Sequence, residues 1–173
     1  MEFRRLTTSH GDIYKKAMDL YEISFPYHEL REKDSQAGIM ENDAYHFNLI
    51  FDENTWVGNM LYWETEDFMY VEHFCILPSM RNKRYGEKAL EFLNGSGKTV
   101  ILEIDPPVDD ISVHRKAFYE RAGFQANAFE HIHPPYHKEY DGHKLVIMSY
   151  PNCLSEMEYH MFSDYMKNVV MTN

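Results

Sequence analysis

Cysteine is scarce in this 173-residue chain, which contains only Cys75 and Cys153. The first residues, MEFRRLTTSHGDIYKK, include no apolar leader of the kind that directs export. The two cysteines are therefore expected to be reduced thiols in the cytoplasm rather than a disulfide. No apolar run approaches the roughly 20 residues that a membrane-spanning helix needs, so no membrane association is expected.

Basic residues are also few, with 17 Lys and Arg against 28 Asp and Glu and a formal net charge of −11. An acidic surface repels nucleic acid and anionic membranes, so neither is an expected partner, whereas a cationic small molecule or a basic peptide is favoured. Linkers and internal repeats are absent as well. Hydrophobic residues make up 44% of the chain, so residues 1–173 are expected to form one globular domain.

Hydrophobic periodicity and turn residues predict an alternation of strands and helices. Three consecutive strands followed by alternating units predict an α/β fold of the α+β type. Its central sheet of about six to seven strands is mixed, mostly antiparallel and flanked by helices, with a parallel pair joined by helix 83–93. The expected strands are 2–7, 45–51, 56–65, 68–77, 99–104, 124–129 and 145–150. The expected helices are a first one capped by Ser9 and ended by Pro26, then 35–40, 83–93, 113–122 and 154–170.

Two of these helices have a clear expected core face. The first presents an apolar stripe that starts at Ile13 and includes Ala17 and Leu20. The C-terminal helix repeats apolar residues at a spacing of four, and this stripe is expected to pack on the core or on a second subunit. It consists of Met157, Met161, Tyr165 and Val169.

The stretch 71–93, VEHFCILPSMRNKRYGEKALEFL, has the features of an anion site. A buried strand stops at Pro78, a short loop follows, and a helix then begins whose first N–H groups have no helical partner. Gly86 would let a phosphate group approach the backbone. Four basic residues lie close together here, namely Arg81, Lys83, Arg84 and Lys88. The stretch therefore indicates a site for a di- or triphosphate group, with a solvated basic helix end as the alternative.

Residues 81–86, Arg-Asn-Lys-Arg-Tyr-Gly, resemble the cofactor-binding signature Arg/Gln-x-x-Gly-x-Gly/Ala of the GNAT superfamily of acyl-CoA N-acyltransferases. Arg81 and Gly86 match the signature, and Arg84 stands at its first glycine and adds a cation. Residues 76–78, Ile-Leu-Pro, resemble the Val-x-Pro that ends the fourth strand of the family. Downstream, residues 117–124 (AFYERAGF) resemble the family pattern Leu-Tyr-x-x-x-Gly-Phe, with Phe118 at the leucine position.

The resemblance implies a GNAT fold with splayed fourth and fifth strands and acetyl-CoA as cofactor. It implies transfer of the acetyl group directly to a primary amine of a small molecule or peptide, and the family often forms homodimers. In the family the fourth strand pairs with the pantetheine arm, and an asparagine often stands where this chain has Ser112. The residues expected to bind coenzyme A are Cys75, Ile76, Arg81, Asn82, Lys83, Arg84, Tyr85, Gly86 and Ser112.

Acetyl transfer to an amine requires an acid, a base and an oxyanion donor. An alkylamine with a pKa near 10.4 is neutral in only about one molecule in two thousand at pH 7, so a base would accelerate the reaction. The resemblance implies Tyr119 as the acid for the leaving thiolate, the N–H of Ile76 as the oxyanion donor and Glu72 as the base. In a regular strand Glu72 shares a face with Ile76, whereas His73 points to the opposite face. The alternatives are a packed tyrosine and a solvent-facing strand carboxylate.

Four histidines gather in the segment 131–143, namely His131, His133, His137 and His143. Their spacing matches no structural zinc pattern and no cysteine pair accompanies them, so no metal is expected. We expect this segment, together with Tyr136, to lie at the mouth of the acceptor pocket. Two other functions stay open: a non-catalytic acyl-CoA-binding or regulatory module with the same fold, and a metal-dependent hydrolase built on these histidines.

Overall fold

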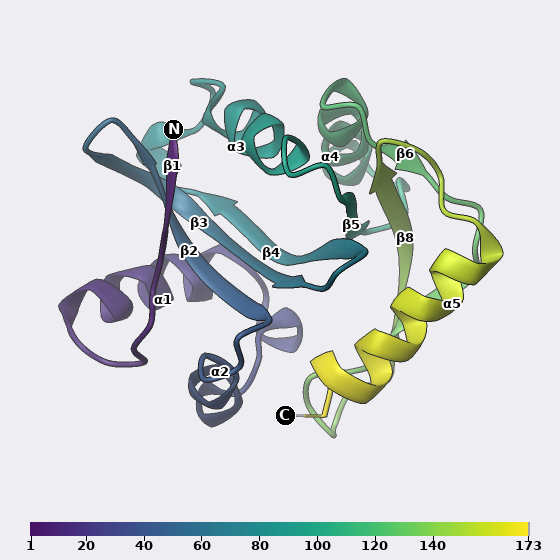
Figure 1. Ribbon diagram of the computed structural model, residues 1–173, viewed down its shortest axis with the longest axis horizontal. Coiled ribbons are helices and arrows are strands. Elements are labelled where there is room, and N and C mark those ends of the chain that lie inside the picture. Colours follow the sequence, from purple (N-terminus) through teal and green to yellow (C-terminus); the bar gives the residue numbers. More distant parts are fainter. Residues whose placement is uncertain (173) are drawn as a thin grey trace.

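The computed structural model describes residues 1–172, and it confirms the expected mixed sheet (Figure 1). The strands lie in the order β1-β2-β3-β4-β5-β8-β6, and β7 also pairs with β8. All pairs are antiparallel except β4–β5, which is the parallel pair expected across α3. The strands are β1 (Glu2–Arg5), β2 (Tyr45–Asp52), β3 (Thr55–Glu64), β4 (Phe68–Ile76), β5 (Thr99–Ile104), β6 (Gln125–Ala126), β7 (His131–His133) and β8 (His143–Tyr150). The helices are α1 (Asp12–Ser24), α2 (Lys33–Ile39), α3 (Tyr85–Asn94), α4 (Asp110–Arg121) and α5 (Glu156–Tyr165), with short 3-10 turns η1 (Tyr27–Glu29) and η2 (Pro78–Met80).

The sheet is covered on both faces, which gives two hydrophobic cores (Figure 1). Helices α1, α2 and α5 cover one face around Tyr21, Trp63 and Phe162. Helices α3 and α4 cover the other face around Leu90 and Phe124, with α4 contributing partly buried aromatic residues. The sequence TVILEI of β5 supplies both cores, as expected for a central strand, because its neighbouring side chains point to opposite faces.

Strands β4 and β5 pair only along part of their length. The pairing runs from Phe68 opposite Thr99 to Val71 opposite Leu102 and stops there, although both strands continue. The register of β4 against β3 also shifts at this level, from Tyr62 opposite Val71 to Leu61 opposite His73. Glu72 is therefore an extra residue in β4, a β-bulge that bends the strand at the point where it leaves β5. This divergence of the two strands confirms the splayed arrangement.

Several helix boundaries differ from the expectation. Ser9 does not cap α1, which begins at Asp12 after Gly11, whose φ is positive at 91°. Helix α4 begins three residues before the expected 113, because Asp109 and Ser112 form a reciprocal capping box. Ile13 is 62% exposed, so the buried face of α1 begins at Ala17 instead.

The C-terminal third departs from the expectation in two places. The expected strand 124–129 is reduced to the two residues of β6, and the histidine segment contributes its own short strand β7 against the start of β8. Helix α5 continues as a π-helical turn, η3 (Met166–Val170). Its buried stripe is Phe162, Met166 and Val170, whereas Met157 and Met161 are 70% and 43% exposed, so the expected core face was wrong by one position.

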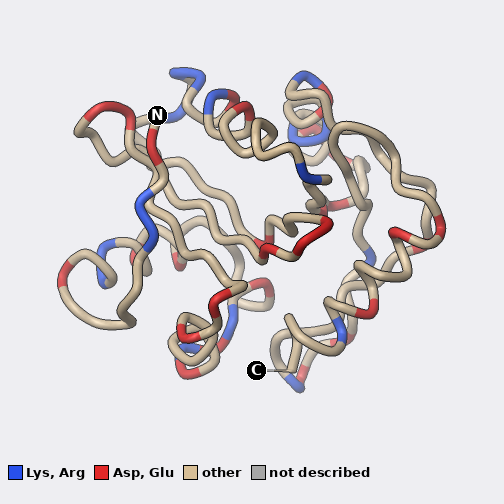
Figure 2. The backbone as a smooth tube through the Cα atoms, in the orientation of Figure 1, with Lys and Arg blue, Asp and Glu red and all other residues tan. Residues whose placement is uncertain are grey.

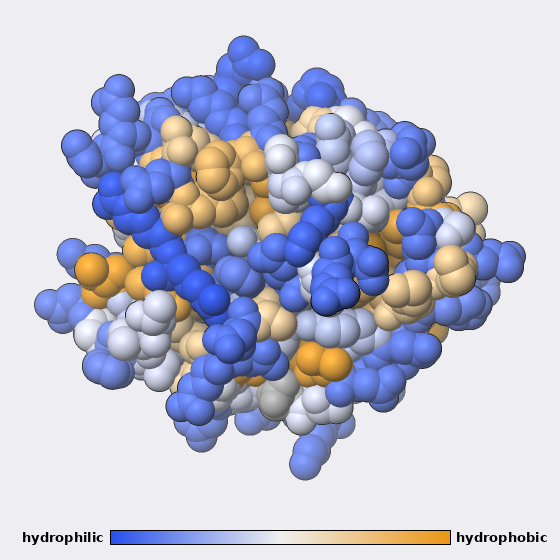
Figure 3. Space-filling model, viewed as in Figure 1, coloured by the Kyte–Doolittle hydropathy of each residue, from blue (hydrophilic) through white to orange (hydrophobic). Residues whose placement is uncertain are grey.

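Figure 2 shows basic residues at the turn before α3 and on α4, while acidic residues spread over many loops and helices. Hydrophilic residues cover most of the face seen in Figure 3. Figure 3 shows an apolar area on this face where β1 lies beside α3. Phe92 is half-exposed there, and its ring lies 4.7 Å from the ring of Phe3. No helix of the described chain is long and apolar enough to cross a membrane.

Candidate active site

A cavity of about 610 Å³ lies where β4 and β5 diverge. Its walls come from the two strands, the end of α1, the turn η1, α4 and the segment between β7 and β8. A volume of this size is typical of a small-molecule site. Five of the predicted residues, far apart in the sequence, line this one cavity: Glu72, Cys75, Ile76, Arg81 and Tyr119.

The free edge of β4 faces the gap between the strands. Leu77 donates its N–H to Val57 on β3. Because successive residues of a strand direct their backbone groups to opposite edges, the N–H and C=O of Ile76 point away from β3 and toward the gap. The side chain of Arg81 already donates from its Nε to this carbonyl, at 3.3 Å. Ile76 therefore presents one donor and one acceptor to an extended ligand lying along β4.

The bulge changes which side chains share a face. Glu72 contacts Trp63 and Arg31 on the α1 side of the sheet, and His73 packs against Tyr21 and Phe25 on the same side. Two consecutive residues can share a face because the extra residue interrupts the alternation. The expectation that His73 opposes Glu72 is therefore wrong, and so is the expectation that Glu72 shares a face with Ile76, which belongs to the opposite core.

Glu72 is part of a buried ion pair. Its Oε1 accepts from Nε of Arg31 at 2.8 Å, and the two side chains are 0% and 2% exposed. The hydroxyl of Tyr136 also donates to Oε1, at 2.8 Å, and the indole of Trp63 donates to Oε2 at 2.7 Å. Burial would raise the pKa of Glu72, but the positive charge of Arg31 and these hydrogen bonds hold it below its usual value. The geometry therefore argues against Glu72 as the base, because a proton acceptor in this role needs a free and more basic oxygen.

Tyr119 lies on α4 and is partly buried against the rings of Phe118 and Phe124. Burial raises its pKa to about 12, so its hydroxyl keeps its proton over the whole physiological range. No hydrogen bond from this hydroxyl to another residue is found within residues 1–172. The phenol is thus available to a ligand in the cavity.

The turn before α3 is formed without its expected glycine. Arg84 adopts the left-handed conformation with φ of 64° and ψ of 12°, and Asn82 has φ of 61°. Helix α3 has no side-chain cap, so the first N–H groups of the helix, at Tyr85 and Gly86, stay open. Lys83 is exposed beside them, and Arg84 pairs with Glu87 at 2.7 Å while remaining 79% exposed. This turn lies outside the cavity, and Arg81 connects the two.

Gly86 and Ser112 have structural partners of their own. A Cβ at Gly86 would lie 3.0 Å from the ring of Phe118, so the glycine also allows α3 to approach α4. The Ser112 side chain is buried and its hydroxyl bonds to the backbone and carboxylate of Asp109. The hydroxyl is therefore occupied within the cap of α4, and the geometry gives no support to its predicted contact with coenzyme A.

The sequence analysis singled out His131 and His133 but missed the buried polar cluster that they form with Glu103. Glu103 of β5 accepts from the hydroxyl of Tyr70 and from His131, and its Oε2 lies 3.9 Å from Nε2 of His133. Nδ1 of His133 lies 2.6 Å from the carbonyl of Pro134 and must donate to it, so in the neutral imidazole Nε2 carries the lone pair. That nitrogen has no hydrogen-bond partner in the described chain. The signal for Glu103 in the sequence was a charged residue inside an apolar strand, TVILEI.

The cavity is also rich in carboxylates. Five acidic side chains line it against two arginines: Glu29, Glu72, Glu103, Asp105 and Asp141 against Arg81 and Arg115. Histidines are the other frequent titratable group: His28, His73, His133 and His143. Such a lining favours a cationic ligand over an anionic one.

A splayed β4–β5 pair beside a helix with an open N-terminus is the arrangement of a coenzyme A-dependent acetyltransferase. A sequence model described as Acetyltransferase (GNAT) family matches residues 12–124. The chain belongs to this family, whose cosubstrate is acetyl-CoA.

Solved structures agree with this assignment. A Bacteroides thetaiotaomicron protein assigned to the GNAT family superposes with a TM-score of 0.93 at 31% identity, covering 100% of this chain and 99% of that one. An aminoglycoside 6′-N-acetyltransferase in complex with coenzyme A has a TM-score of 0.63 at 15% identity, covering 86% and 96%. The ribosomal-protein-S18-alanine N-acetyltransferase of Escherichia coli has a TM-score of 0.57 at 16% identity, covering 89% and 95%. The last two show the shared fold alone. A search among curated proteins found no significant match.

Proposed function

We propose that this protein transfers the acetyl group of acetyl-CoA directly to a primary amine of a cationic small molecule or peptide. One observation carries the proposal: the gap between β4 and β5 brings Tyr119, the free backbone edge of Ile76 and an acidic cavity together. The free backbone edge of Ile76 and the hydroxyl of Tyr119 would bind a thioester, whereas the carboxylates of the cavity would attract an ammonium group.

Acetyl-CoA fits two features of the chain. The C=O of Ile76 would accept from an amide N–H of the pantetheine arm, which leaves the N–H of Ile76 for the thioester oxygen, and Cys75 would flank the arm. The uncapped start of α3 would hold the pyrophosphate on the N–H groups of Tyr85 and Gly86, where the helix dipole favours an anion. Arg81, Asn82, Lys83 and Arg84 would surround it with donors and positive charge.

Tyr119 would act as the general acid. When the amine attacks the thioester carbon, the N–H of Ile76 would stabilise the charge on the carbonyl oxygen. As the bond from carbon to sulfur breaks, Tyr119 would give its proton to the departing sulfur. A phenol with a pKa of about 12 is fully protonated at neutral pH and can do so.

His133 would accept the proton of the amine in place of Glu72. Its Nε2 has a free lone pair, and the carboxylate of Glu103 at 3.9 Å would stabilise the imidazolium that forms. Glu72 would instead stabilise the wall of the cavity through its ion pair with Arg31.

A screen of amines for release of free coenzyme A thiol tests the proposal. The wild-type protein should release thiol with at least one di- or polyamine or basic peptide. Tyr119→Phe should lower kcat at least tenfold with little change in the affinity for acetyl-CoA, because it removes only the proton donor. Tyr165→Phe on α5, away from the cavity, is the matched control and should keep full activity. Unchanged turnover in Tyr119→Phe would remove this residue from the mechanism.

The alternative is a non-catalytic acyl-CoA-binding or regulatory module. The observation in its favour is the buried ion pair with Arg31, which occupies the carboxylate of Glu72 so that it does not act as a base. Tight binding of acetyl-CoA without thiol release, for every amine in the panel, would support this module.

A further inference from the structure

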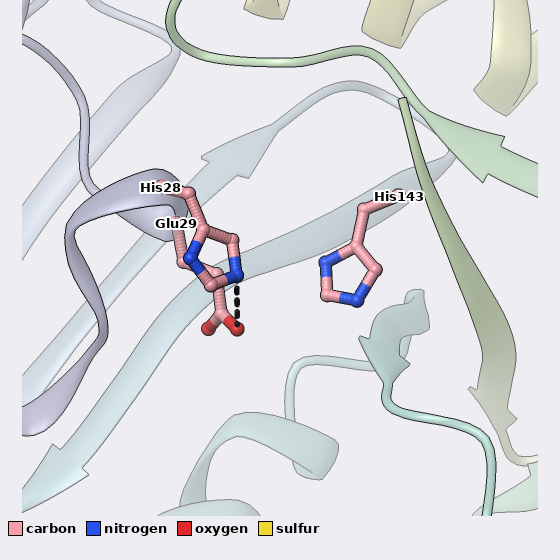
Figure 4. Close-up of side chains that lie close together, drawn as sticks. All are labelled: His28, Glu29 and His143. Atoms are coloured by element: carbon pink, nitrogen blue, oxygen red, sulfur yellow. Dashed lines mark ion pairs between the residues drawn. The ribbon is translucent and has the colours of Figure 1, made fainter. Parts of the chain in front are cut away.

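Two histidines and a glutamate meet at the mouth of the cavity. The side chains of His28, Glu29 and His143 each place one ligand atom within 4.8 Å of the others. Figure 4 shows His28 and Glu29 reaching from the turn η1, while His143 comes from the first residue of β8 on the other side of the gap. Nε2 of His28 lies 3.7 Å from Oε1 of Glu29.

This donor set matches the chemistry of zinc. Two imidazoles and one carboxylate are a common set of three protein ligands, and they leave a fourth position open for water or another ligand. Bonds of about 2.1 Å in a tetrahedral site place ligand atoms about 3.4 Å apart. The His28–Glu29 pair is already near this value. The other ligand atoms lie within 4.8 Å, so they must approach by at most about 1.4 Å, which rotation of partly exposed side chains can supply.

The surrounding charges also favour a cation. Oδ1 of Asp105 lies 3.5 Å from Nε2 of His143, while the other oxygen of Asp105 pairs with Arg115. Glu29 is a second carboxylate beside His143. A divalent ion between these groups would compensate the two carboxylates, and Asp105 would orient His143 as an outer-shell acceptor or become the fourth ligand.

We propose that His28, Glu29 and His143 bind a divalent transition metal ion, with Zn²⁺ as the natural occupant, at the mouth of the cavity. The ion would join η1 to the start of β8. Its open position would face the cavity, because all three ligands line it. The site is distinct from the histidine cluster of the segment 131–143 as a whole, since His143 alone of those four takes part.

The test is a metal titration of tag-free protein that has been treated with a chelator and dialysed. Co²⁺ should bind with one equivalent and give the visible absorption of a low-symmetry site, and Zn²⁺ should displace it. His143→Ala and His28→Ala should each weaken Co²⁺ binding at least tenfold. His160→Ala, an exposed histidine on α5, is the control and should bind as the wild type does.

Absence of saturable Co²⁺ binding up to millimolar concentration would overturn the proposal, as would equal affinity in the wild type and in both histidine variants. Should His143→Ala fail to fold, His28→Ala and Glu29→Gln test the same site from the exposed turn, and each should still weaken Co²⁺ binding. The readout needs neither acetyl-CoA nor an amine, so the metal-site proposal and the acetyltransferase proposal are tested independently.

Discussion

The buried ion pair between Arg31 and Glu72 allows the sharpest quantitative prediction. Glu72→Gln keeps the shape of the side chain, but its single oxygen can accept from only one of Tyr136 and Trp63, which donate to different oxygens of Glu72. It also leaves the guanidinium of Arg31 buried without its counter-charge. Removing one partner of a buried pair costs about 3–5 kcal/mol. Since a domain is stable by roughly 5–15 kcal/mol in total, urea unfolding followed by circular dichroism should detect the loss easily.

An exposed pair provides the control for this prediction. Lys33 and Glu22 lie 3.1 Å apart but are 82% and 41% exposed. Glu22→Gln should therefore change the free energy of unfolding by less than about 1 kcal/mol. The double variant Arg31→Met with Glu72→Gln should be more stable than Glu72→Gln alone, because no unpaired charge remains. If Glu72→Gln costs no more than Glu22→Gln, the reasoning about the buried pair is refuted.

The same ion pair predicts how the stability of the protein changes at acidic pH. The pKa of Glu72 in the folded protein lies below its unfolded value of 4.5. Its charge therefore contributes its full stability above pH 4.5, and this contribution is lost as the pH falls through the folded pKa. The difference in stability between wild type and Glu72→Gln should consequently shrink as the pH is lowered from 7 to below 4. A difference that stays constant over this range would contradict the assignment.

Three further results are expected. Iodoacetamide at pH 8 should modify exposed Cys153 but not Cys75, because burial raises the pKa of Cys75 to about 11. Mass spectrometry should show a second adduct only when the protein is unfolded in denaturant. Arg84→Gly should weaken acetyl-CoA binding about two- to fivefold, because it removes an exposed positive charge. It should not lower the stability, since glycine adopts φ of 64° freely. Calorimetry measures the binding, and urea unfolding measures the stability. The kcat profile should show no loss attributable to Tyr119 between pH 6 and 9.5, since that hydroxyl keeps its proton.

Much of the fold could be predicted because local patterns determine it. The apolar run of β5, with turn residues on both sides, indicates a central strand whatever surrounds it. The stop at Pro78 and the period change after it indicate the strand-to-helix transition that forms the candidate cofactor site. The expected core face of the last helix was wrong because its apolar residues form two overlapping stripes, and only packing selects the one with Phe162.

The candidate site was less predictable, because it depends on contacts between distant segments. No residue pattern marks the bulge at Glu72, yet it turns this side chain toward Arg31, which comes from another loop. His28 and His143 are far apart in the sequence, so their proximity follows only from the meeting of η1 with β8. By contrast, Tyr119 reaches the cavity as expected, because a helical motif carries it.

Binding of acetyl-CoA is the claim on which the proposed function depends most directly. Calorimetric titration of the purified protein should give a single saturable site with one equivalent of acetyl-CoA, and Arg81→Ala should weaken it, since Arg81 joins the turn before α3 to the edge of β4. The absence of any binding heat at millimolar acetyl-CoA would contradict the account.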